Sequence, residues 1–366
     1  MSKFFNNIAF LQSFLANKNE ISYNETIIIV LIVFITVLFC LASFFVIVAL
    51  YLRLKNYFKA QNRNQLEAKW KEEILEILAE EEQPRELTEQ IKEHNRLFFL
   101  DYLFRFALRI KGQELTILSE IASPFTNMLL ERIKTGDKTQ KVRALITLDK
   151  LQIHSIEDDL YYQLLKDSSP LVSLYTARSM VKVGKRKYMS MIIQTLPKYE
   201  NWSYRVLSNI LAEAGPAHTD LLRKALLNKN LPVKSRTIIG HTLLILHDIK
   251  AADLAVKVLQ KERQSKLIPK CLEIIANTGA PGHRIVVKAY TESEDPEIRA
   301  KAIKALGVVG QPEDVPLIEK LFIKDSNWVS LYAARALKNL KADNVLQKFS
   351  TQSGSKAEIA KFVLQS

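Results

Sequence analysis

One seven-residue phrase occurs twice in this chain, and its spacing constrains the fold more than any other feature. Residues 172–178 read VSLYTAR and residues 329–335 read VSLYAAR, so six of seven letters match at positions 157 residues apart. Related phrases recur roughly every 31 residues. The copies are KVRALITL (141–148), VSLYTARSM (172–180), YRVLSNILAEAG (204–215), VKSRTIIGHTLL (233–244), KCLEIIANTG (270–279), IRAKAIKALGVVG (298–310) and VSLYAARAL (329–337).

Each copy follows another short amphipathic helical pattern, such as MSMIIQTL (189–196), TDLLRKALL (219–227), DLAVKVLQ (253–260) and VPLIEKLF (315–322). A helix pair of about 30 residues cannot bury its own apolar face, whereas pairs stacked side by side form a continuous core. The period therefore predicts an all-α fold, with an α-solenoid of about seven helix pairs over residues 115–366.

The phrase EDPEIRAKAIKALGVVG (294–310) resembles the second half of a HEAT repeat, with Asp-Pro, an aliphatic-Arg pair, small residues, Leu and Gly. The short period is similar to that of compact bacterial HEAT arrays. The resemblance implies a right-handed solenoid, but a fold of this kind says little about function.

Single positions of the phrase carry further expectations. Asp295 and Pro296 are expected to cap and start a helix. Small residues at Ala300, Ala302 and Ala305 permit close helix packing. Gly307 and Gly310 are expected to end the helix in left-handed turns.

The resemblance also implies that the repeat's arginine pairs with an aspartate of its own or the next repeat, here Asp137 or Asp295. Ser173 and Ser330 replace this arginine, and Cys271 takes its place in the weak copy.

Residues 26–52, TIIIVLIVFITVLFCLASFFVIVALYL, contain no charged residue, Asn, Gln, Gly or Pro. About 20 apolar residues span the hydrocarbon core of a bilayer. A cleavable signal would have a basic start and a small-residue cleavage site, and a buried core helix would have a polar edge. The segment is therefore predicted to be a transmembrane helix.

Lys and Arg after this segment set the expected orientation. The 20 residues that follow it hold six of them, whereas the 25 residues before it hold two. The positive-inside rule predicts a single-pass protein of the cell membrane with its N-terminus outside and residues 53–366 in the cytoplasm. The expected parts are an extracytoplasmic tail (1–25), the transmembrane helix (26–52), juxtamembrane helices with a solenoid cap (53–114) and the repeat domain (115–366).

Two short regions complete this organisation. In the tail, Phe4, Ile8, Leu11 and Leu15 share one helical face, which fits either an interfacial helix or a weakly ordered terminus. After the membrane segment, apolar residues from Leu66 to Leu78 recur at helical spacing. A second helix is expected from about Arg85 to Lys111, its apolar portion sealing one end of the solenoid rather than forming a groove.

The sequence offers no sign of catalytic, cofactor or metal chemistry. Its six histidines show no metal-binding spacing, its two cysteines form no CxxC, and GxGxxG, GxxxxGK[ST] and GxSxG are absent. The formal charge of +13 favours anionic partners. Because 39 acidic residues are interspersed with the basic ones, nucleic acid is not the expected partner.

Candidate contact residues fall into three groups. Tyr175 with Arg178 and Tyr332 with Arg335 share helix faces and are residue types common at binding hot spots, although packing between repeats explains them equally well. Arg143, Arg205, Lys234 and Arg299 form either a ladder for acidic partners or structural ion pairs. Arg53, Lys55, Lys59 and Arg63 either grip anionic lipid headgroups or serve orientation alone.

The leading functional hypothesis is a non-enzymatic, membrane-anchored scaffold whose solenoid binds a protein partner, such as a component of an envelope assembly, polysaccharide synthesis or secretion complex. The HEAT resemblance leaves an enzymatic alternative, of the chromophore-lyase or DNA-glycosylase type. A sensor of anionic lipid surfaces is a third hypothesis.

Overall fold

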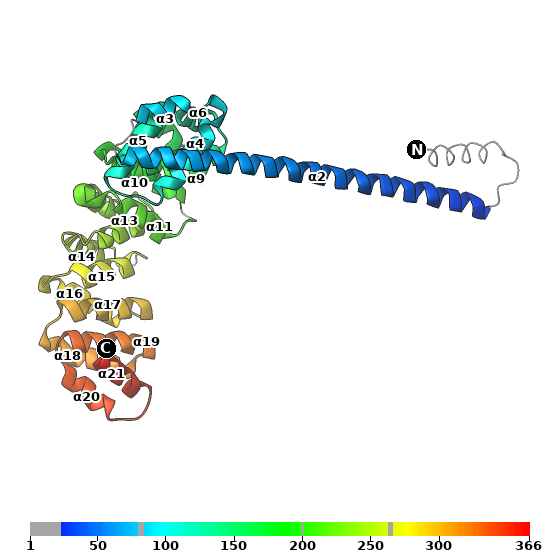
Figure 1. Ribbon diagram of the computed structural model, residues 1–366. Helices are drawn as coiled ribbons and strands as arrows, with labels where there is room; N and C mark the ends of the chain where they lie inside the picture. The colour runs from blue at the N-terminus through cyan, green and yellow to red at the C-terminus, as the bar shows by residue number, and fades with distance from the viewer. Residues whose placement is uncertain (1–22, 80–83, 200, 263–265) are drawn as a thin grey trace. The chain divides into compact units, whose positions relative to one another are not determined.

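The computed structural model of the chain describes residues 23–79, 84–199, 201–262 and 266–366 (Figure 1). In these ranges every regular element is an α-helix or a short 3-10 helix, so the all-α prediction is confirmed. The chain divides into two compact units, Met1–Gln90 and Ile91–Ser366. The predicted face of Phe4, Ile8, Leu11 and Leu15 lies outside the described residues.

A single long helix dominates the first unit. Helix α2, Tyr23–Leu78, runs for 56 residues without a break, which corresponds to about 84 Å at the usual helical rise. It contains both the apolar run and the juxtamembrane stretch, so the boundary expected at residue 52 lies inside one helix. It is long and apolar enough to cross a membrane, and none of its most apolar window is buried.

The C-terminal part of α2 has a buried stripe instead. Trp70, Ile74 and Ile77 follow each other at helical spacing and are almost fully buried, as is Leu87 of α3 (Pro84–Gln90). The Lys69 Nζ donates to Gln90 Oε1 at 3.2 Å and links the two helices. The period of apolar residues therefore located this stripe correctly.

The prediction of one continuous helix from Arg85 to Lys111 is wrong, because the range is divided into several helices. Helix α3 ends at Gln90, and Lys92 takes an extended conformation with φ −59° and ψ 143° before η1 (Glu93–Asn95) and α4 (Arg96–Ala107). Helix α4 buries Phe99, Leu100 and Leu103, whereas α3 buries only Leu87. A local break in the backbone separates these two short helices.

The second unit begins with η1, α4 and α5 (Gln113–Ala122) and continues as helix pairs. In each pair, the first helix is termed the A helix and the second the B helix. The A helices are α6 (Thr126–Thr135), α8 (Asp158–Leu165), α10 (Arg186–Thr195), α12 (Thr219–Leu227), α14 (Ala251–Lys261), α16 (Arg284–Ala289), α18 (Val315–Lys324) and α20 (Asp343–Ser350). The B helices are α7 (Lys138–Lys150), α9 (Pro170–Val183), α11 (Tyr204–Ala212), α13 (Val233–Ile245), α15 (Ile268–Thr278), α17 (Pro296–Val309), α19 (Asn327–Asn339) and α21 (Ser355–Gln365).

Short 3-10 helices lie at the ends of several of these helices. They are η2 (Ser123–Phe125), η3 (Leu196–Tyr199), η4 (Gly215–His218), η5 (Pro281–His283), η6 (Tyr290–Glu292) and η7 (Pro312–Asp314).

The B helices pack in chain order as one row, from α7 and α9 to α19 and α21 (Figure 1). The A helices α10, α12, α14 and α16 pack on each other in a second row, and the predicted copies of the repeat all lie in B helices. Because the core is formed between neighbouring pairs, the architecture is the α-solenoid that the period predicts. Helix α21 adds a B helix that the sequence pattern did not show.

Local sequence explains where the B helices begin. The carboxylate of Asp137 accepts hydrogen bonds from the backbone N–H groups of Thr139 and Gln140 at 2.7 and 2.9 Å. Asp295 accepts from Glu297 N at 2.8 Å, and Pro296 occupies the first turn of α17, as expected. Both aspartates therefore satisfy free helix N–H groups.

The glycines of α17 act differently from the expectation that they end the helix. Gly307 lies within α17, and Gly310 has an extended backbone with φ −74° and ψ 172°. A Cβ added to Gly307 would lie 2.8 Å from Ala336 Cα and 2.9 Å from Ala336 Cβ. Gly307 therefore permits the close approach of α17 and α19.

We predict that Gly307→Ala destabilises the second unit by about 1–3 kcal/mol because the added methyl overpacks this contact, although alanine favours a helix. Gly282→Ala is the matched control, since a Cβ there meets nothing within 4 Å. Chemical unfolding of both variants in non-ionic detergent checks this prediction. Equal free energies of unfolding for the two variants would contradict this prediction, because they would show that α17 and α19 can move apart to accommodate the methyl group without loss of stability.

Candidate functional site

A recurring contact joins neighbouring repeats and fixes the register of the B helices. On five B helices, one side chain contacts the residue 26 positions later, in the segment that starts the next B helix. We term this the linking position. The five contacts are Lys141 with Asp167, Ser173 with Tyr199, Arg236 with Glu262, Arg299 with Asp325, and Ser330 with Lys356.

The contact of Arg299 with Asp325 shows the geometry in detail. Arg299 Nε and Nη2 donate to the two carboxylate oxygens of Asp325 at 2.7 and 2.9 Å. Arg299 Nη1 donates to the main-chain oxygens of Ser293 and Glu294 at 2.8 and 2.9 Å. The guanidinium of Arg299 lowers the pKa of the Asp325 carboxyl, despite the opposing effect of burial.

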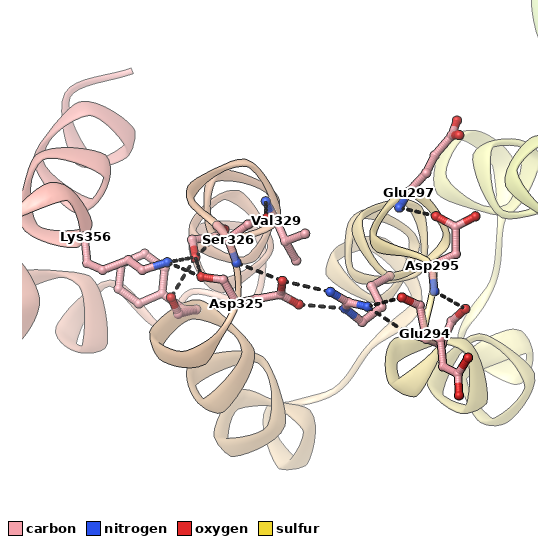
Figure 2. Close-up of polar contacts among 11 residues, drawn as sticks. Glu294, Asp295, Glu297, Asp325, Ser326, Val329 and Lys356 are labelled. Atoms are coloured by element: carbon pink, nitrogen blue, oxygen red, sulfur yellow. Dashed lines mark hydrogen bonds and ion pairs between the residues drawn. The ribbon is translucent and has the colours of Figure 1, made fainter.

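The next contact in the series is adjacent to this pair. Figure 2 shows Asp325 between Glu294 on one side and Lys356 on the other. Lys356 Nζ donates to the main-chain oxygen of Asp325 at 2.6 Å and also to Ser330 Oγ. Burial lowers the pKa of Lys356. Consecutive linking contacts thus form one polar network across α17, α19 and α21.

Serine replaces arginine at two linking positions without loss of the contact. Ser330 Oγ donates to Phe322 O at 2.8 Å, and Ser173 Oγ donates to Leu165 O, in each case eight residues earlier. Both hydroxyls are fully buried. The serine of the VSLY phrase is therefore a packing residue that ties its own A helix to its B helix.

Most of the predicted basic ladder lies off the linking position. Arg299 occupies it, but Lys141 and Arg236 take the places expected for Arg143 and Lys234. Arg143 Nη2 instead pairs with Asp101 Oδ2 at 2.9 Å, and Lys234 is exposed. The expectation is corrected because two-residue shifts in the alignment move a side chain to another face of the helix.

Arg205 and Cys271 also depart from the expectation. Arg205 is exposed and lies 3.4 Å from Tyr204 Oη through its Nε. One period after Arg236 stands Leu267, which is fully buried, whereas Cys271 lies four residues later. The partner of Arg299 belongs to the next repeat, as the resemblance implied, but it is Asp325 rather than Asp137 or Asp295.

Side chains that reach the surface of the two VSLY helices form matching stripes at one-turn spacing. We term them the α9 stripe, made of Leu171, Tyr175 and Arg178, and the α19 stripe, made of Trp328, Tyr332 and Arg335. Leu171 is 40% and Trp328 46% exposed, and the two tyrosines are half-buried. The Trp328 and Tyr332 rings meet edge to face at 5.6 Å.

The arginines of the two stripes differ in their surroundings. Arg178 forms two contacts with the Glu213 carboxylate, at 3.1 Å through Nη2 and 3.3 Å through Nε. Within the described residues, Arg335 has no ion-pair partner and is exposed. The same phrase therefore presents a neutralised arginine in one repeat and a free one in the other.

The free arginine lines a cleft of about 420 Å³ between α17, α19 and α21. Its lining residues are Lys304, Tyr332, Arg335, Ala336, Lys338, Asn339, Val363 and Ser366. Lys338 Nζ donates to Val363 O at 2.9 Å and so caps the end of α21. No Asp or Glu side chain lines this cleft, which we term the C-terminal cleft.

The α9 stripe borders a different cavity. Leu171 and six residues of α4 and α7 line an apolar groove of about 230 Å³. Its lining includes the apolar side chains of Phe104, Val142 and Ile146, and also Arg143. The groove continues the hydrophobic surface of the α9 stripe.

A buried lysine near the middle of the B row was missed by the sequence reasoning. Lys270 is 7% exposed, and its Nζ lies 2.7 Å from Glu273 Oε2 and 3.2 Å from His241 Nδ1. The Tyr204 ring contacts His241 edge to face at 5.2 Å. Burial and the Lys270 charge lower the pKa of His241. Lys270 stands one period before Lys301, and this repeated lysine is the sequence signal that could have identified it.

The predicted headgroup residues lie on α2. Arg53, Lys55, Lys59 and Arg63 are all exposed, as are Tyr57 and Phe58 between them. Among the described residues, no group of three or more His, Cys, Asp or Glu could hold a metal ion.

Comparison with known proteins identifies the repeat type. Residues 252–338, from α14 to α19, match the family model of HEAT repeats. This match, together with the paired helices, confirms the HEAT-like solenoid that residues 294–310 resemble. None of the curated proteins matches the chain.

Similar solved structures include an engineered protein at 17% identity and TM-score 0.35, which covers 73% of this chain and 77% of that one. Kap121p bound to Pho4p is similar at 12% identity and TM-score 0.46, and a mutant of Kap121p at 12% and 0.45. These matches cover 76% of this chain and 38% of Kap121p, so the chain spans well under half of that protein.

We predict that Asp325→Asn lowers the stability of the second unit by about 1.5–3 kcal/mol at neutral pH, because a hydrogen bond to a charged group is lost. The wild-type carboxyl has a lowered pKa when folded, so its contribution is present above about pH 4 and is lost as the pH falls through the folded pKa. The difference between the two proteins should therefore shrink in acid.

Thermal unfolding by circular dichroism at pH 7, 4 and 2.5 measures this difference. Glu358→Gln is the control, because the Glu358 side chain is 72% exposed and pairs only along its own helix. A difference between wild type and Asp325→Asn that stays constant from pH 7 to 2.5 would contradict an ionised Asp325 in the contact.

Proposed function

We propose that this chain is a membrane-anchored scaffold whose solenoid binds a protein partner through the exposed face of the B helices. The α19 stripe is the observation that carries the proposal. Trp, Tyr and Arg are the residues that most often dominate binding energy at protein interfaces, and Trp328, Tyr332 and Arg335 lie together on exposed turns of one helix.

The packing of the repeats supports this assignment. The linking contacts join neighbouring repeats without the α19 stripe, whereas Arg178 of the α9 stripe also pairs with Glu213 of the next repeat. A half-exposed aromatic pair beside a cleft is a surface that association can bury. The A helices also expose single apolar residues, such as Ile285 at 80%, but these are scattered.

Helix α2 supports the anchor. Its apolar run is longer than the approximately 20 residues that a bilayer requires, and its exposed face would otherwise contact water. The excess of Lys and Arg after residue 52 favours a cytoplasmic solenoid. The scaffold would thus be held beside a membrane complex.

The lipid-sensing role is a weaker proposal on geometric grounds. Along a continuous α2, Arg63 stands ten residues beyond Arg53, or about 15 Å. The polar headgroup layer is about 5–8 Å thick on each side. Arg53 and Lys55 can therefore contact headgroups directly, whereas Lys59 and Arg63 contact them only if the helix tilts.

Labelling with a membrane-impermeant maleimide tests the proposed topology. In a Cys40→Ala background, Ser2→Cys is expected to react in sealed right-side-out vesicles and Glu358→Cys only after the vesicles are opened. Cys271 is fully buried and its thiol pKa is raised to about 12 by burial, so it supplies little background. Labelling of Glu358→Cys in sealed vesicles would show that the solenoid lies outside the cell, and so would contradict the proposed topology.

Capture of partners with the full chain tests the scaffold. From membranes solubilised in mild detergent, partners cross-linked to the wild type should be lost with Trp328→Ala/Tyr332→Ala, because truncation of buried aromatic anchors costs about 2 kcal/mol or more each. Ile285→Ala is the matched control on an A helix. Absence of any reproducible partner would refute the scaffold, and capture unaffected by the double variant would place the interface elsewhere.

A further inference from the structure

We infer that the C-terminal cleft binds an extended, acidic segment of a protein partner, and that Arg335 and Lys304 pair with its carboxylates. This inference rests on the proposed scaffold function and specifies the chemistry of its partner. It starts from the difference between the two VSLY repeats, in which Arg178 is neutralised and Arg335 is not.

The cations that line the cleft outnumber its anions, because Lys304, Arg335 and Lys338 are accompanied only by the terminal carboxylate of Ser366. Lys304 and Arg335 are exposed and have no ion-pair partner there, whereas Lys338 is engaged with Val363 O. The lining includes no carboxylate side chain. Two free cations at a concave surface attract an anion more strongly than cations on a flat surface.

The spacing of the cations suits an extended chain. Lys304 and Arg335 are 31 residues apart, so they occupy the same position on adjacent B helices. Packed helices lie about 8–10 Å apart. In an extended segment, side chains two residues apart lie on the same face and are separated by about 7 Å. Acidic residues at this spacing can therefore reach both cations.

The rest of the cleft favours protein over other anions. Tyr332 supplies apolar surface next to the basic residues, whereas Ala336 and Val363, which also line the cleft, are buried. Trp328 extends this apolar surface along α19 and contacts Tyr332. An apolar side chain between acidic ones fits this combination, and the planar guanidinium of Arg335 can bind a carboxylate with two hydrogen bonds.

The α9 stripe provides an internal control. It has the same tyrosine and arginine, but Glu213 already supplies the carboxylate that pairs with Arg178. An acidic segment there would have to displace Glu213 from this contact. The same arginine thus has a carboxylate partner within the described residues in one repeat and none in the other, and Arg178→Gln and Arg335→Gln are chemically identical changes.

Fluorescence anisotropy tests the inference with the full chain in non-ionic detergent at low ionic strength. The probe is a labelled peptide with Glu-Leu-Glu-Glu between Gly-Ser flanks, and the control peptide has Gln in place of Glu. Arg335→Gln and Lys304→Gln should each raise the Kd at least about tenfold, as expected for loss of a charge-assisted hydrogen bond. Arg178→Gln should change it less than about twofold, and Lys304→Glu/Arg335→Glu should instead favour a peptide with Lys in place of Glu.

Three outcomes would overturn the inference: equal binding of the Glu and Gln peptides, equal effects of Arg178→Gln and Arg335→Gln, or Arg335-dependent binding of anionic vesicles without peptide binding. Thermal unfolding of each variant checks that it remains folded. If cross-linked partners are lost with Trp328→Ala/Tyr332→Ala but retained by Lys304→Glu/Arg335→Glu, the scaffold proposal stands and the acidic partner does not.

Discussion

The interaction that fixes register in the repeat stack is the contact between one B helix and the segment that starts the next, which occurs at five of the seven junctions between the described B helices. A pair of short helices cannot bury its apolar face alone, so every pair needs a neighbour at a fixed register. The contact 26 residues ahead supplies that register with chemically different groups: a guanidinium with a carboxylate at Arg299, a hydroxyl with a phenol at Ser173. In these five contacts the position along the helix is the same and the buried polar groups are hydrogen-bonded, whereas the residue type varies.

Because the linking position forms the contact between repeats, side chains on other turns of the B helices can face the surface. In the VSLY phrase the buried serine serves packing, whereas tyrosine and arginine on the opposite turns reach the surface. Whether that surface is vacant depends on residues outside the phrase. Glu213, on the neighbouring helix end, neutralises Arg178, and no side chain described near Arg335 does the same. A repeated sequence therefore becomes two different surfaces through its neighbours.

The period, the helix pairs and the HEAT-like fold could be predicted because they depend on local apolar spacing and on a phrase written several times. Register within a copy could not, since the linking side chain of α13 stands two residues after Lys234, at Arg236, and only its contact with Glu262 identifies it. Gly307 was misread as a helix end because glycine permits both turns and close packing, and only the position of Ala336 distinguishes them. Glu213, the partner of Arg178, and His241, which lies beside Lys270, belong to other parts of the fold, where sequence spacing gives no distance.

The net charge of +13 illustrates the same limit at the level of composition. Many basic side chains already face a carboxylate, among them Arg186 with Asp220, Arg223 with Asp248, and Arg284 with Asp314. These charges form ion pairs within the fold and contribute little to the long-range attraction of a partner. A close ion pair acts as a dipole, and its field is screened beyond about 10 Å. The charge that can recognise a partner is the unpaired remainder, and its location matters more than its sum. In the C-terminal cleft that remainder lies beside aromatic residues on a rigid helix, where a small number of charges suffices for specificity.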